Sequence, residues 1–148
     1  MRIARMAALC MASATVVACS RLVSVPAPGP EALESATMAQ VYFWRAKPDH
    51  IADYSRYIRE VAEPIDREAQ RTGAFLSVTT YQVADTAVPW THMRVFLLRD
   101  SAQWRGLSAA LAAAGIRAEP DSLRRRERAA YAATLRDPAG AALTRLVR

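Results

Sequence analysis

The sequence predicts an α+β fold in which helices cover one face of an antiparallel sheet. Segments rich in β-branched and aromatic residues alternate with longer segments whose apolar residues recur every three or four positions. Their order along the chain is strand, helix, strand, strand, helix. The two consecutive strands are separated by a short stretch that contains a proline, so a hairpin is the simplest connection between them.

The first strand is predicted at residues 41–45, where VYFWR combines β-branched and aromatic side chains. Asp49 is expected to cap the helix that follows, and Gly73 is expected to end it. Pro64 lies inside this helix and removes one backbone hydrogen bond, so we expect a kink or a break there. The apolar positions of the helix form one face, made by Ile51, Tyr54, Ile58, Val61 and Ile65.

The next two strands are predicted within residues 74–84 and 91–98, AFLSVTTYQVA and THMRVFLL. Asp100 and Ser101 then begin a second helix, which Gly115 is expected to close. Its apolar side is formed by Trp104, Leu107 and Leu111.

A third helix is predicted after residue 116, with Asp121 and Ser122 as its cap and with Asp137-Pro138 as its end near Arg136. Its inner side would carry Leu123, Ala130, Tyr131, Thr134 and Leu135. Residues 141–147 can form either a fourth strand or one more helical turn, and propensity does not decide between the two.

The N-terminal segment predicts export from the cytoplasm. Residues 1–18 have two arginines followed by an uncharged apolar stretch that is too short to span a bilayer, as in a secretory signal peptide. Val16-Val17-Ala18-Cys19 resembles the lipobox of bacterial lipoproteins, which implies cleavage before Cys19 and attachment of lipid to its sulfur. Ser20 is not the aspartate associated with inner-membrane retention, so the resemblance implies the outer membrane and a domain that faces the periplasm. The alternative is ordinary cleavage after Ala18, which would leave a soluble protein.

Removal of the signal and lipidation of Cys19 would leave the mature chain without a free thiol, because Cys10 lies within the signal. Residues 19–39 contain three prolines within five residues and show no helical or strand period, which indicates a Pro-rich tether. Residues 40–148 would then form one domain with a helical C-terminal extension from about residue 116.

The βαββα order carries a resemblance to a known superfamily. Residues 47–73, KPDHIADYSRYIREVAEPIDREAQRTG, as the first helix and 99–104, RDSAQW, at the start of the second resemble the dimeric α/β-barrel superfamily. Within it, the chain is similar to NIPSNAP-like and antibiotic-biosynthesis-monooxygenase-like proteins over roughly residues 40–115. The resemblance implies a ferredoxin-like βαββα(β) fold with helices on one face of the sheet, here with an extra C-terminal helix. Members include cofactor-free monooxygenases, isomerases and proteins without known catalysis, so it implies a fold more than an activity.

A homodimer is expected because one face of the sheet would otherwise expose aromatic side chains to water. In the third strand the nearly aliphatic face is expected to lie under the helices, and it consists of Thr91, Met93, Val95 and Leu97. The opposite, open face would carry His92, Arg94, Phe96 and Leu98. A second copy or the C-terminal segment would cover it.

His92 and Arg94 are the candidate site residues, because they lie two apart on a strand and point to the same side. The histidine could act as a base and the arginine could stabilise negative charge. The expected ligand-binding set is Tyr42, Trp44, Thr79, Tyr81, His92 and Arg94. The alternative is a polar patch in a dimer interface or barrel lumen, and His50 is expected to be an exposed neighbour of the helix cap.

No spacing of histidines, cysteines or acids resembles a metal site, and there is no nucleotide-binding or nucleophile motif, so no cofactor is expected. Residues 116–148 carry eight arginines and four acids, with a basic run at 124–128. Export argues against nucleic acid as the partner of this run, so we expect a solvated helix face or attraction to anionic headgroups or envelope polymers.

Together these observations predict a membrane-anchored periplasmic lipoprotein that acts as a non-catalytic ligand- or partner-binding module. The alternative is a cofactor-independent monooxygenase or isomerase of the dimeric α/β-barrel type that uses His92 and Arg94.

Overall fold

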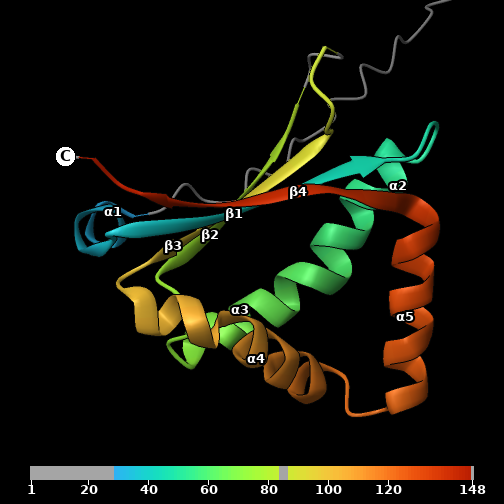
Figure 1. Ribbon diagram of the computed structural model, residues 1–148. Coiled ribbons are helices and arrows are strands. Elements are labelled where there is room, and N and C mark those ends of the chain that lie inside the picture. The colour runs from blue at the N-terminus through green and yellow to red at the C-terminus, as the bar shows by residue number, and fades with distance from the viewer. Residues whose placement is uncertain (1–28, 84–86, 148) are drawn as a thin grey trace, which may run out of the picture.

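A computed structural model describes residues 29–83 and 87–147 and has a ferredoxin-like α+β fold (Figure 1). One antiparallel sheet has the strand order β2-β3-β1-β4. Its strands are β1 (Met38–Ala46), β2 (Ser77–Gln82), β3 (His92–Leu98) and β4 (Arg136–Arg145). The helices are α1 (Pro30–Ser35), α2 (Ile51–Tyr57), a π-helical turn η1 (Ile58–Ala62), α3 (Glu63–Arg71), α4 (Ser101–Ala118) and α5 (Ser122–Leu135). The predicted α+β class and element order are confirmed.

The first long helical segment consists of α2, η1 and α3, and its irregularity lies next to Pro64 as predicted. Proline cannot donate the backbone hydrogen bond of a regular helix, and the chain widens into a π-helical turn immediately before it. The predicted cap is wrong: Asp49 has a φ of 65° in a turn, and His50 precedes the first helical residue without a side-chain cap. Gly73 ends the segment with a φ of 79°, and its N–H donates to the carbonyl of Gln70 over 2.9 Å.

Helix α4 begins as predicted, because the carboxylate of Asp100 accepts hydrogen bonds from the backbone N–H groups of Ala102 and Gln103 at 2.8 and 3.0 Å. Its predicted end at Gly115 is wrong, since the helix continues to Ala118. The helix ends where Glu119 becomes extended before Pro120, a position at which helical geometry is disfavoured.

The third predicted helix is α5, which starts with Asp121 as its cap. Leu135 is buried as predicted, whereas Leu123 and Tyr131 are about half exposed. Residues 141–147 were expected to form either a strand or a helical turn, and most of them belong to strand β4. This strand pairs with β1 along its length, and α5 lies between α4 and β4 in the chain order. The register shifts opposite Phe43 and Trp44, next to Pro138, which cannot donate to the sheet.

The folded domain begins earlier than predicted. Residues 30–39 were expected in the tether, but they contain α1 and the first residues of β1. Ala36 and Ala39 are buried, and the carbonyl of Thr37 accepts a hydrogen bond from the N–H of Leu146. The first strand therefore extends beyond its predicted aromatic centre by Met38, Ala39 and Gln40 at one end and by Ala46 at the other.

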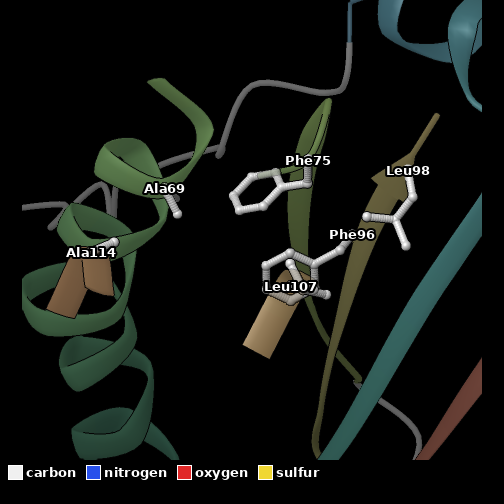
Figure 2. Packing of buried hydrophobic residues seen from close by; sticks show 6 residues of the cluster. All are labelled: Ala69, Phe75, Phe96, Leu98, Leu107 and Ala114. Carbon is white, nitrogen blue, oxygen red and sulfur yellow. The ribbon is translucent and has the colours of Figure 1, made fainter. Parts of the chain in front are cut away.

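The main core lies between the sheet and the helices α3 and α4. Figure 2 shows the rings of Phe75 and Phe96 close to Leu107, and an edge-to-face contact of 5.1 Å joins the two rings. The cluster consists of Ala69, Phe75, Phe96, Leu98, Leu107 and Ala114. A second cluster joins α2, α5 and the sheet through Ala46, Tyr54, Ile58 and Leu135. Burial of each large side chain contributes about 2–3 kcal/mol, so these two clusters are the main support for the helical layer.

The predicted orientation of β3 is wrong. Phe96 and Leu98 face the helices, so His92 and Arg94 on the same side of the strand face them too. Val95 and Leu97 belong to a cluster with Ala36 and Ala39 on the other side of the sheet. The sequence pattern failed because Phe96, Leu97 and Leu98 place apolar side chains on both faces of β3, and burial by the helices selected the face with the aromatic ring.

Candidate functional site

The sheet divides the six predicted ligand-binding residues between its two faces. The register pairs Tyr42 with Arg94 and Trp44 with His92, so these four side chains lie together on the face covered by the helices. Thr79 pairs with Val95 and Tyr81 pairs with Met93, which places both on the opposite face. The six residues therefore do not form one site. We call the face without Arg94 the outer sheet face, and its central side chains are Val41, Phe43, Thr79, Tyr81, Met93 and Val95.

His92 is enclosed by packing, with 1% of its surface exposed. Its Nε2 lies 3.0 Å from Oγ of Ser55, its Nδ1 lies 2.9 Å from Oγ1 of Thr91, and its ring meets that of Tyr54 edge to face at 4.6 Å. Burial lowers the pKa of His92 to about 4, because the protonated ring would lose its hydration. The ring is therefore neutral near pH 7, and hydroxyl groups satisfy both of its nitrogens.

Arg94 is 8% exposed and forms a buried ion pair with Asp66 of α3, to which its Nη2 donates a hydrogen bond. Its guanidinium also lies 5.2 Å from the ring centre of Phe96. Burial lowers the pKa of Arg94 to about 10, which still leaves the group charged. The sequence analysis missed Asp66, although an acid one helical turn from Ala62 and Ala69 on the buried side was a signal for a buried partner.

Arg136, another residue that the sequence analysis did not select, lies on the same face as Arg94. Its guanidinium stacks 4.8 Å from the ring centre of Trp44 and 5.4 Å from that of Tyr54. Burial raises the pKa of Tyr54 to about 12, while the positive charge of Arg136 acts in the opposite direction. Burial also raises the pKa of Tyr57, which Arg136 and Arg128 partly offset. Both phenols therefore stay protonated near pH 7.

The basic run at 124–128 is used partly for structure. Arg125 donates hydrogen bonds to the carbonyls of Glu119 and Pro120, both at 2.7 Å, and Arg128 pairs with the carboxylate of Glu119 at 3.0 Å. These contacts close the corner between α4 and α5. Arg126 is exposed and has no hydrogen bond or ion pair within the described part of the chain.

His50 lies at the start of α2, as predicted, with its Nδ1 3.3 Å from a carboxylate oxygen of Asp53 and 45% of its side chain exposed. Residues 29–83 and 87–147 contain no cluster of three histidines, cysteines or acids that could hold a metal ion. In the same residues, no helix has the length and apolar character required to cross a bilayer. The predicted signal peptide and Cys19 lie outside the described residues.

Two solved structures align with this chain. HapK from Hahella chejuensis aligns with a TM-score of 0.50 at 8% identity, over 74% of this chain and 92% of that protein. PA3566 from Pseudomonas aeruginosa aligns with a TM-score of 0.42 at 16% identity, over 76% of this chain and 94% of that protein. No protein-family model matches the sequence, and no curated protein matches it either. The likeness to HapK concerns the fold alone and agrees with the ferredoxin-like assignment.

Proposed function

We propose that this chain is an envelope lipoprotein whose domain faces the periplasm and acts as a non-catalytic binding module. Support for the anchor comes from the sequence, where Cys19 follows an apolar segment and a lipobox-like Val16-Val17-Ala18. Two acyl chains are sufficient for stable attachment to a bilayer, so no transmembrane helix is required. The absence of aspartate after Cys19 supports the outer membrane as the site of attachment.

The burial of His92 and Arg94 is the observation that carries the choice of a binding module. A general base must reach its substrate, but His92 is 1% exposed and burial lowers its pKa to about 4. Arg94 is already paired with Asp66, so its charge is compensated within the domain. These contacts favour structural roles for both residues over the monooxygenase or isomerase alternative.

The module works as a homodimer in this proposal, with the outer sheet face as the contact between the two copies. This face presents partly exposed Phe43, Met93 and Val95, and Tyr81 is 46% exposed beside them. Phe43 also packs against Trp90 at 5.3 Å, which extends the apolar surface. A sheet face of this composition suits a two-fold contact, and the resemblance to a dimeric superfamily points to the same arrangement.

The dimer is tested by sedimentation velocity of the chain from residue 19 with Cys19→Ser, over a micromolar concentration series. We expect a dimer that Met93→Lys converts to a monomer, because two lysines would lie desolvated at the two-fold contact. Ser108→Lys adds the same charge on the exposed side of α4 and should leave the dimer intact. A monomeric wild type, or an unchanged Met93→Lys dimer, would contradict the arrangement.

The anchor is tested by mass spectrometry of the mature chain from the membrane fraction of a Gram-negative host. We expect an N-terminal cysteine that carries diacylglycerol and release of Cys19→Ser from the membrane. A mature chain that begins at Met1, or Cys19→Ser that stays with the membrane, would exclude the anchor. For the enzymatic alternative, His92→Ala should abolish turnover of any substrate found, and unchanged turnover would exclude His92 as the base.

A further inference from the structure

Arg136 differs from the other buried cation of the domain because no acid neutralises it. Its side chain is half-buried at the junction of α5 and β4, and its Nε, like that of Arg94, is buried without a hydrogen-bond partner. Among residues 29–83 and 87–147, the Arg136 side chain forms no ion pair or hydrogen bond. Of the acids near Arg94, Asp66 pairs with Arg94 itself, and Glu63 lies 3.7 Å from Arg67 while its Oε1 is buried without a hydrogen-bond partner.

Stacking on aromatic rings compensates only part of the cost of burying a guanidinium. The rings of Trp44 and Tyr54 lie 4.8 and 5.4 Å from the Arg136 guanidinium and supply attraction from their faces. They do not accept its N–H groups, which normally pair with an anion or a carbonyl when water is excluded. Arg136 is therefore a positioned cation whose Nε has no acceptor among the described residues.

The surroundings of Arg136 indicate what kind of acceptor fits. The ring of Tyr57 lies edge to face with that of Tyr131 at 6.3 Å, and the Tyr131 side chain is 50% exposed. The charges of Arg136 and Arg128 both act on the Tyr57 phenol. The Tyr57 hydroxyl has no hydrogen bond within the described parts of the chain. The guanidinium of Arg136 and the rings of Tyr57 and Tyr131 thus belong to the region where α2 and α5 contact each other. Figure 1 shows these two helices side by side.

We propose that this end of the domain binds a small aromatic carboxylate, with its carboxylate on the guanidinium of Arg136 and its ring against Tyr57 and Tyr131. A planar carboxylate matches the two parallel N–H groups of an arginine fork, and its single charge balances that of Arg136. This inference rests on the proposed binding function and gives it a ligand class. It assigns the recognition role to Arg136 and leaves His92 and Arg94 in the packed interior.

The test is a titration of the ¹⁵N-labelled chain from residue 19, carrying Cys19→Ser, with sodium benzoate and, separately, with benzamide. We expect saturable shifts at the Trp44 indole and the backbone of Arg136 with benzoate, and an affinity for benzamide that is lower by about tenfold or more. Arg136→Gln should weaken benzoate binding by a similar factor. Arg126→Gln, which removes an exposed arginine of α5 with no partner, should change it by less than about twofold.

Several results would overturn the inference. Equal binding of benzoate and benzamide would show that charge is not recognised, and equal losses in Arg136→Gln and Arg126→Gln would indicate unspecific attraction to the basic surface. Absence of saturable binding to the wild type would exclude the site. The comparison of benzoate with benzamide needs only the wild type, so it decides the question even if Arg136→Gln fails to fold. The dimer and the lipid anchor are measured separately, so their failure is distinguishable from failure of this site.

Discussion

The buried histidine predicts a specific loss of stability in mild acid. His92 is neutral in the folded state because burial lowers its pKa to about 4 from an ordinary value of 6.5. Above pH 6.5 the ring is neutral in both states, so its contribution to the free energy of unfolding is constant there. As the pH falls from 6.5 towards 4, the unfolded chain binds a proton that the folded chain does not, and the free energy of unfolding decreases.

The size of this loss follows from the pKa difference. The slope is about 1.4 kcal/mol per pH unit between the two pKa values, which gives about 3 kcal/mol over the whole interval. Carboxylates with hydrogen-bonding partners have lowered pKa values, so their contributions to the free energy of unfolding are lost at lower pH. Arg71 and Arg117 lower the pKa of Glu68 to about 2, so its contribution is present above its unfolded value of 4.5 and is lost below it. The interval from pH 6.5 to 4.5 therefore isolates His92, with an expected loss of about 2–3 kcal/mol.

The assay is urea unfolding, followed by tryptophan fluorescence at intervals from pH 7 to 4.5, on the chain from residue 19 with Cys19→Ser. His92→Gln should remove most of the slope over this interval, whatever its own cost at pH 7. His50→Gln removes the other histidine of the chain, whose side chain is 45% exposed, and should retain the slope. A flat wild-type profile between pH 6.5 and 4.5, or a His92→Gln profile as steep as that of the wild type, would refute the assignment of this slope to His92.

Four further predictions concern packing and charge, and each is measured by urea unfolding at pH 7. Asp66→Asn should destabilise the fold by about 3–5 kcal/mol because it leaves Arg94 charged and buried without its partner, whereas Asp66→Leu with Arg94→Met should be nearly neutral. Phe96→Ala should cost about 3–5 kcal/mol, since its ring fills the centre of the core, and a cost below that of an exposed substitution would contradict this packing. Asp100→Ala should cost about 1 kcal/mol through loss of two hydrogen bonds at the start of α4, with Asp100→Asn retaining most of the stability. Arg136→Met should change stability by less than about 1 kcal/mol, because the apolar side chain replaces a cation that has no ionic partner, and a large loss would indicate an unrecognised partner.

The order of strands and helices could be predicted because local patterns determine it. Pro64 predicted the irregular helical turn, Gly73 predicted the end of α3, and Asp100 and Asp121 predicted the starts of α4 and α5. Each of these signals acts through the backbone within one turn. Asp49 failed as a cap because the turn before α2 places it at positive φ, which depends on how the chain leaves β1.

The faces of the sheet could not be predicted from β3 alone. The run Phe96-Leu97-Leu98 supplies apolar side chains to both sides, so alternation does not identify the inner face. Burial of Phe96 and Leu98 against the helices selects the inner face, and Arg94 on that face is paired with Asp66, 28 positions away in another element. An acid on the buried side of a helix and a basic residue in an apolar strand each need a partner of opposite charge, so considering the two together predicts a buried ion pair.

The candidate site at Arg136 depends on its contacts with Trp44 and Tyr54, which are far from it in the sequence. For this reason the local sequence after α5 did not identify Arg136 as a candidate. Sequence reasoning gave weight to His92 and Arg94 because their chemistry is versatile, yet within the fold both nitrogens of His92 lie against hydroxyl groups and the charge of Arg94 is paired with Asp66. Arg136 has weaker sequence signals and stronger structural ones: two aromatic faces, no ion pair within the described residues and the phenol of Tyr57 nearby. A residue that completes its interactions inside the domain contributes mainly to stability, whereas one held in place with interactions left open is available for recognition. The small stability change expected for Arg136→Met and the large one expected for Asp66→Asn express this difference in measurable form.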